Sequence, residues 1–108
     1  MTNTYQTTVQ KNLNGKWKAE TMVKNINGYD WEISTYKWDK KGLVCMAQAC
    51  QKTEFGTTFV IFQDPSIKLY QVQGRGTEKA IKETHEMGLL AFDKLIASGE
   101  LPHRESSE

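Results

Sequence analysis

The sequence predicts an α+β domain, in which an antiparallel sheet of four to five strands is followed by one C-terminal helix packed on one face. Three observations predict it. Segments between residues 16 and 73 alternate apolar and polar side chains, as strands with one wet face do. Asn27-Gly28 separates two of these segments and favours the positive φ angles of a tight hairpin turn. Residues 77–99 carry apolar side chains at spacings of three and four, which indicates a helix with one buried stripe.

The hairpin joins strands that we expect over residues 16–25 and 29–38. Each has one face that is suited to a core, because its apolar residues and threonines recur at every second position. These inward sets are Trp17, Ala19, Thr21 and Val23 in the first strand, and Trp31, Ile33 and Thr35 in the second. Tyr36 and Trp38 fall on the opposite, more polar face of the second strand.

The remaining strands are expected over residues 43–52, 57–63 and 67–73. The turn Asp39-Lys40-Lys41-Gly42 precedes the first of them. That strand is apolar on both faces at its start, which is typical of a central strand. Asp64-Pro65-Ser66 separates the other two, since proline cannot donate to a ladder.

The helix has a start signal, an end signal and a buried stripe. Thr77 can cap its first turn, while Gly99 and Pro102 mark its end. His85 lies within the stripe and has no second histidine nearby in the sequence, so we expect a hydrogen-bonded core residue rather than a catalytic base or metal ligand. The stripe consists of Ile81, His85, Gly88, Leu89, Phe92, Leu95 and Ile96.

The 108 residues, of which 38% are hydrophobic and 25% charged, suffice for one domain with its own core. We expect a flexible N-terminal arm over residues 1–12, the domain over 13–101, and a flexible tail over 102–108. Cys45 and Cys50 are five residues apart in one strand, so they point to opposite faces and cannot easily bridge. The first residues do not resemble a signal peptide, and no apolar run could span a membrane. We therefore expect a cytoplasmic protein without a cofactor or metal.

Charge excludes some classes of nucleic-acid-binding protein. The net charge is +1, which argues against a strongly basic binder of duplex DNA. Residues 1–54 hold eight lysines and five acids (+3), whereas residues 55–108 hold six basic and eight acidic groups (−2). Lysines supply twelve of the fourteen basic residues, and lysine is less suited than arginine to bidentate recognition of a base or phosphate.

Aromatic and basic residues together suggest one binding surface. Aromatic side chains on a sheet can stack bases while lysines follow the phosphates of a single strand. Trp17 and Trp31 are expected in the core, so the stacking candidates are Tyr36 and Trp38. The lysine candidates are Lys16, Lys18, Lys24, Lys37, Lys40 and Lys41. In element order, strands followed by a helix, the chain resembles the Whirly and PUR-type single-strand-binding domains.

A second candidate site is the run Gln71-Val72-Gln73-Gly74-Arg75-Gly76, between the last strand and the helix. Glycines let the backbone approach a ligand, and amides at a helix N-terminus can hold an anion. Gly74, Arg75, Gly76 and Thr77 are therefore candidate anion-binding residues. The run resembles the pyrophosphate-binding turn of acyl-CoA-dependent N-acetyltransferases, which implies an acyl-CoA ligand. The resemblance covers six residues, and one helix follows where that family continues through further strands and helices.

A protein partner is the alternative function. One helix can cover only one face of the sheet, yet some strands are apolar on both faces, so a partner chain, a ligand or sheet curvature should cover the other. We expect a homodimer, or an interaction or inhibitor module, for example of the mobile-element type. Met87 and Leu90 lie outside the buried stripe of the helix and are candidates for such a contact. The sequence thus favours a non-enzymatic single-strand binder, then a protein-interaction module, then an acyl-CoA-binding enzyme.

Overall fold

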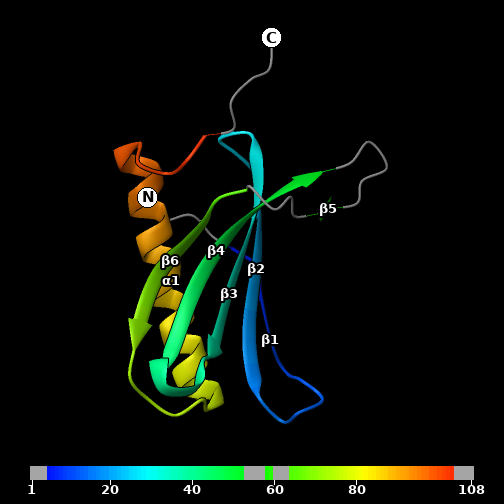
Figure 1. The fold of residues 1–108 in the computed structure, drawn as a ribbon, viewed down its shortest axis with the longest axis vertical. Coiled ribbons are helices and arrows are strands. Elements are labelled where there is room, and N and C mark those ends of the chain that lie inside the picture. Colours follow the sequence, from blue (N-terminus) through cyan, green and yellow to red (C-terminus); the bar gives the residue numbers. More distant parts are fainter. Residues whose placement is uncertain (1–4, 53–57, 60–63, 104–108) are drawn as a thin grey trace.

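The computed structural model describes residues 5–52, 58–59 and 64–103. It has the α+β arrangement that the sequence predicts, with an antiparallel sheet followed by one C-terminal helix (Figure 1). The elements are β1 (Thr7–Lys11), β2 (Trp17–Ile26), β3 (Tyr29–Lys37), a 3-10 turn η1 (Asp39–Lys41), β4 (Leu43–Lys52), β5 (Thr58–Phe59), β6 (Ser66–Val72) and α1 (Glu78–Ser98). The strands lie in the order β1-β2-β3-β4, with β6 beside β4 and the short β5 paired to the end of β4.

The β2–β3 hairpin turns at the predicted dipeptide. Asn27 has φ 55° and Gly28 has φ 85°, the positive values that a tight hairpin turn of this kind requires. The register pairs Ile26 with Tyr29 across the turn and Val23 with Trp31 further along. This register sets which residues of both strands share the inward face.

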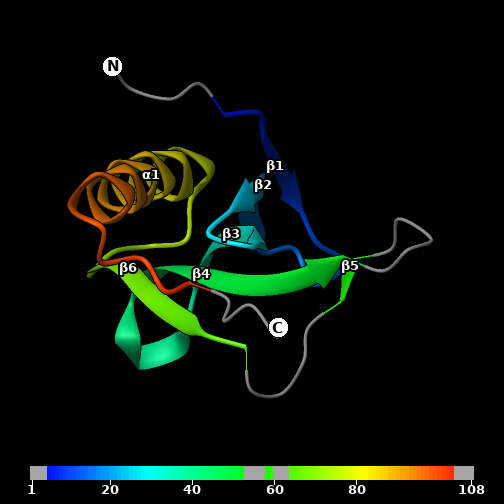
Figure 2. The same cartoon turned by 90° about the horizontal axis from the view of Figure 1, so that it is seen from above.

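The helix packs on the face that carries the predicted inward residues (Figure 2). Trp31 is fully buried there, and its ring meets Phe92 of α1 edge-on, with 5.8 Å between ring centroids. Trp17 is only half-buried, because it lies at the end of the sheet beside the start of the helix. The buried inward residues are Ala19, Thr21, Val23, Trp31, Ile33, Thr35, Cys45, Ala47 and Ala49.

Both ends of α1 have the predicted caps. The hydroxyl of Thr77 accepts a hydrogen bond from the amide of Ala80 at 3.2 Å. Gly99 adopts the left-handed conformation that commonly closes a helix. In the middle of the helix, Gly88 lies directly over Cys45 of β4, and a Cβ at this position would meet Sγ at 2.1 Å. A residue without a side chain is therefore needed for this close helix–sheet contact.

Strand β1 lies where the sequence predicted part of a flexible arm. Thr7–Lys11 pair with Trp17–Thr21, and the Tyr5 hydroxyl is hydrogen-bonded to the carboxylate of Asp93 on α1. Only Val9 of this strand is partly buried, against the cluster of Ala19, Leu43 and Ile81. Backbone pairing rather than apolar burial holds β1, which explains why hydrophobic periodicity did not reveal it.

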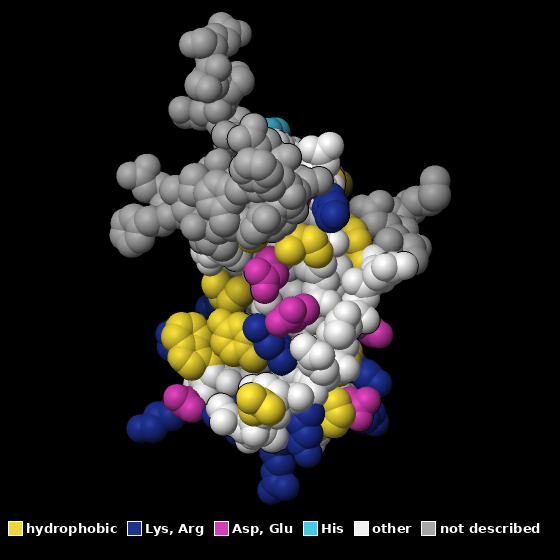
Figure 3. Space-filling model, turned by 90° about the vertical axis from the view of Figure 1, so that its right-hand side faces the viewer, with side chains coloured by type: hydrophobic (Ala, Val, Ile, Leu, Met, Phe, Trp, Pro, Cys, Tyr) yellow, Lys and Arg dark blue, Asp and Glu magenta, His cyan; other side chains and the backbone are white. Residues whose placement is uncertain are grey.

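The sheet face away from the helix is mainly polar. Lys18 and Glu20 form an ion pair on it at 2.8 Å, and Met22 is 41% exposed. Val44 points to this face and is nevertheless buried. Viewed from the side opposite the helix, the molecule shows hydrophobic side chains interspersed with lysines and acids (Figure 3). The expected cover for this face stays a prediction.

Other predictions lie partly beyond the described residues. Most of the strand expected over residues 57–63 falls outside them, and Thr58–Phe59 are its described part. The tail expected over 102–108 is described only to His103. Both cysteines are buried free thiols. In the described ranges, no helix is long and apolar enough to cross a membrane.

Candidate nucleic-acid interface

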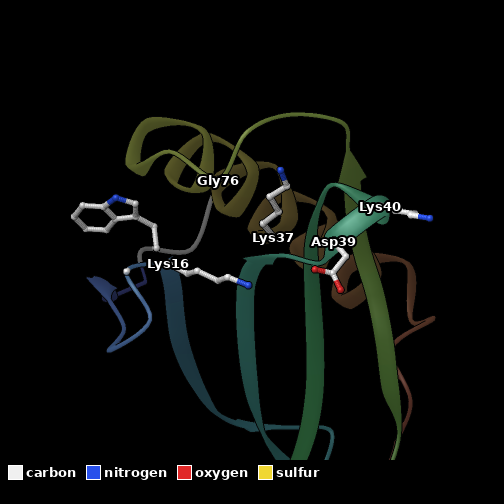
Figure 4. Close-up of a pocket in the computed structure, with 7 residues that line it drawn as sticks. Lys16, Lys37, Asp39, Lys40 and Gly76 are labelled. Carbon is white, nitrogen blue, oxygen red and sulfur yellow. The ribbon is translucent and has the colours of Figure 1, made fainter.

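A lysine-lined cavity of about 570 Å³ lies at the end of the sheet where the helix begins (Figure 4). Three connections meet there: the β1–β2 turn, η1 after β3, and the segment from β6 to α1 (Figure 1). We call it the lysine cleft. It is lined by Gly15, Lys16, Trp17, Lys37, Asp39, Lys40 and Gly76.

Short hydrogen bonds fix the turn that presents Lys16. The side-chain oxygen of Asn12 accepts from the amides of Asn14 at 3.0 Å and Lys16 at 2.9 Å. The amide of Asn12 in turn donates to the carbonyl of Lys16 at 2.8 Å. Lys16 therefore enters β2 from a closed turn, which holds its backbone at the edge of the cleft.

Lys37, the last residue of β3, supports the opposite wall. The backbone of Gly76 lies against its stem, and a Cβ on Gly76 would stand 3.3 Å from Cβ of Lys37. Beyond Lys37, η1 is closed by hydrogen bonds from the Trp38 amide to the Gly42 carbonyl and from the Lys41 amide to the Trp38 carbonyl, each 2.8 Å. This tight turn places Asp39 and Lys40 in the lining.

The cleft has an excess of positive charge. Its lining holds three lysines against one carboxylate, that of Asp39. In the described part of the chain, the ion pairs are Lys18–Glu20 and Lys82–Glu78, and neither includes a cleft lysine. Figure 4 shows the Lys16 side chain extending toward Asp39, while Lys40 points away from it. Lysine or arginine side chains also project from this lower end of the molecule in Figure 3. An anion in the cleft would compete with the Asp39 carboxylate for Lys16.

The predicted stacking residues lie at the same end of β3 as this cleft, but Tyr36 points to the sheet face away from the helix and the cleft lining includes neither residue. The rings of Tyr36 and Trp38 are tilted by 47°, with centroids 6.4 Å apart, and Trp38 is 45% exposed. The ammonium of Lys41 lies 4.0 Å from the centroid of the Trp38 ring, which is a cation–π contact. A base that stacks on Trp38 must use the other face of the indole or displace Lys41.

The structure brings some of the predicted lysines together and separates others. Lys16, Lys37 and Lys40 line the cleft, and Lys41 contacts Trp38. Lys18 is bound by Glu20, and this hydrogen bond raises its pKa. Lys24 lies toward the far end of β2, eight residues from Lys16, which is about 25 Å along a strand.

Among the predicted anion-binding residues, Gly76 alone lines the cleft. Gly74 lies against Leu43, where a Cβ would stand 3.3 Å from its Cδ1. Arg75 is exposed, and the Thr77 hydroxyl is engaged as the helix cap. The glycines therefore do not share one cradle of the kind that the acetyltransferase turn would need.

Sequence reasoning missed several contributors to the cleft. Gly15 was not singled out, although Asn14-Gly15 is a typical turn pair. Trp17 was expected only in the core, whereas it lines the cleft and has the ammonium of Lys11 5.8 Å from its ring centroid. Asp39 was expected only as a turn residue.

His85 and Cys45 are buried titratable groups whose surroundings favour their neutral forms. His85 is hydrogen-bonded to two threonine hydroxyls, and burial lowers its pKa to about 4. Burial also raises the pKa of the Cys45 thiol to about 11, which disfavours the reactive thiolate. Within residues 5–52, 58–59 and 64–103, no group of three or more His, Cys, Asp or Glu residues could hold a metal ion.

Comparisons with protein-family models, with curated protein sequences and with solved structures found no match to this chain.

Proposed function

We propose that this protein is a non-enzymatic binder of single-stranded nucleic acid. The observation that supports this most strongly is the aromatic pair of Tyr36 and the exposed Trp38 at the end of β3, next in sequence to residues that line a cleft with lysines from separate segments. Unstacked bases bind to aromatic rings, and lysines attract the phosphates between them. The pair and the cleft would supply both contributions.

Single strands suit this surface better than duplexes do. Stacking on Trp38 requires a base whose face is free, which a base pair inside a duplex does not offer. The basic residues at the cleft are lysines, which act as point charges and lack the bidentate geometry that reads base edges. We therefore expect little preference among sequences.

A tryptophan-fluorescence titration with a short poly-thymidine strand tests the proposal. Binding should quench the fluorescence to saturation and weaken as salt rises, because counterions are released from the strand. Trp38→Ala and Tyr36→Ala should each weaken binding by roughly tenfold, since stacking of one base contributes about 1–3 kcal/mol. Affinity of the Trp38→Ala protein is read from the anisotropy of a labelled strand, because its own signal changes.

Lys24→Gln is the matched control, since it removes one positive charge at the far end of β2. It should leave affinity nearly unchanged. Absence of binding at low salt would exclude the proposed function. Unchanged affinity in Trp38→Ala, with binding that still weakens as salt rises, would show that charge alone, without stacking, holds the strand.

A protein contact is the second candidate, favoured by two exposed apolar side chains on α1. Met87 is 44% and Leu90 43% exposed, and their spacing of three places them side by side on the helix. We propose a homodimer, or a partner protein, in contact with this position. In either case we propose a cytoplasmic location, in which both buried cysteines stay reduced.

A further inference from the structure

We propose that the lysine cleft holds a terminal phosphate, so that the protein prefers strands with a phosphorylated end. This deepens the proposed function and rests on it. The ligand class is the phosphate monoester, whether at the 5′ or the 3′ end of a strand.

The size and place of the cleft suit the end of a strand. Its volume of about 570 Å³ is in the range of pockets that hold one small ligand. It thus has room for a nucleotide-sized group rather than for a length of chain. It also lies at the end of the sheet, at and beyond the last residue of β3.

Charge favours a monoester over an internal phosphate. A phosphate monoester carries about −1.5 to −2 charges near neutral pH, whereas each internal diester carries one. The lining holds three lysines and the single carboxylate of Asp39; because the Lys40 side chain points away, Lys16 and Lys37 exceed that carboxylate by one positive charge. Lys16 and Lys37 come from different segments that line the cleft, so a terminal phosphate bound there would be attracted by both ammonium groups.

The cleft and Trp38 both lie at the end of β3. Lys37 immediately precedes Trp38, and Asp39 and Lys40 immediately follow it. All three of these neighbours line the cleft, while Trp38 presents its exposed ring. A nucleic-acid strand that stacks on Trp38 would therefore pass the end of β3 to place its terminal phosphate in the cleft.

Dissociation constants for three poly-thymidine strands test the inference: one with a 5′-phosphate, one with a 3′-phosphate and one with hydroxyls at both ends. The wild-type protein should prefer one phosphorylated strand over the hydroxyl strand by roughly tenfold, the factor expected for a hydrogen bond to a charged group. Lys37→Gln should reduce that ratio nearly to one while the hydroxyl strand still binds. Lys24→Gln, with the same loss of charge, should keep the ratio.

If the wild-type protein binds the phosphorylated and hydroxyl strands equally well, the inference is overturned. The proposed function would remain intact, because binding of the hydroxyl strand tests that function alone. Equal loss of the ratio in Lys37→Gln and Lys24→Gln would also overturn it. If the hydroxyl strand does not bind, thymidine 5′-monophosphate and 3′-monophosphate are titrated while amide NMR shifts are followed. Shifts confined to Gly15, Lys37 and Gly76 would support the phosphate site independently, and their absence would exclude it.

Discussion

His85 connects the helix to two strands through both of its ring nitrogens. Nε2 lies 2.7 Å from the hydroxyl of Thr21 on β2, and Nδ1 lies 2.7 Å from that of Thr35 on β3. Thr21 is hydrogen-bonded in turn to Thr7 on β1 at 2.7 Å. A neutral imidazole donates from one nitrogen and accepts at the other, so this arrangement satisfies it without a charge.

Stability should therefore depend on pH through His85. Burial lowers its folded-state pKa to about 4, whereas an unfolded histidine titrates near about 6.5. Below about pH 6.5 the unfolded chain binds a proton that the folded chain excludes, so the free energy of unfolding falls as pH falls. The loss approaches about 3 kcal/mol by pH 4. Urea unfolding across this interval measures it.

His85→Gln is the comparison variant, since its amide can replace part of the hydrogen bonding but does not titrate. It should be less stable than the wild type near neutral pH, and its stability should decline less between about pH 6.5 and 4. If the free energy of unfolding falls equally with pH in both proteins, the pH dependence does not come from His85.

The nature of His85 could be predicted, but its partners could not. Its place in the apolar stripe, without another histidine nearby, predicted a hydrogen-bonded core residue, and the structure confirms this. Thr21 and Thr35 were recognised only as inward residues of their strands. Nothing in either strand shows that the two hydroxyls flank one point on a helix 50 or more residues away.

At the scale of elements, the contact between α1 and β4 depends on Gly88. Gly88→Ala would add a Cβ 2.1 Å from Sγ and 2.8 Å from Cβ of Cys45, so the helix must move away from the sheet. Overpacking of this kind costs about 1–3 kcal/mol, more than the ~1 kcal/mol that alanine contributes to helix propensity. We expect net destabilisation by about 1–2 kcal/mol, measured by urea unfolding.

Cys45→Ala provides the control, because it removes the sulfur atom that the new methyl group would meet. Gly88→Ala should be less harmful in that background, and a double-mutant cycle gives the coupling free energy. Additive effects would show that the helix accommodates alanine without touching Cys45.

The elements that could be predicted were those whose own residues include a turn pair, a helix cap or a regular apolar spacing. The hairpin rests on Asn27-Gly28 and the helix on its caps and stripe, and the structure confirms both. Strand β1 has the sequence Thr-Thr-Val-Gln-Lys, with Val9 as its one partly buried residue. Its place is set by pairing with β2, which periodicity within the segment itself cannot reveal.

At the scale of the whole molecule, the candidate site is a product of topology. Lys16, Lys37 and Gly76 are separated by 20 residues or more in the chain and meet only because the strand ends and the helix start lie together. The sequence identified all three as candidates, but assigned them to two different sites. Their convergence requires the order of the strands, which no local pattern specifies.

The proposed homodimer is a property of the whole molecule, and sedimentation tests it. Sedimentation at increasing protein concentration should show a monomer–dimer equilibrium, and Met87→Lys with Leu90→Lys should shift it to monomer, because buried lysines oppose an apolar contact. Met22→Lys is the matched control, since Met22 is similarly exposed but lies on the sheet. A monomer at every concentration would exclude the dimer.

The placement of the helix after every strand has a consequence for synthesis on the ribosome. The Tyr5–Asp93 and Asn27–Leu101 hydrogen bonds join residues 88 and 74 positions apart. The core can therefore form completely only after α1 has been synthesised. Until α1 emerges, the nascent sheet exposes Trp31, Ile33 and their neighbours to solvent. Such long-range contacts slow folding, and exposed strands favour aggregation. The nascent chain should therefore need chaperone protection until α1 has docked.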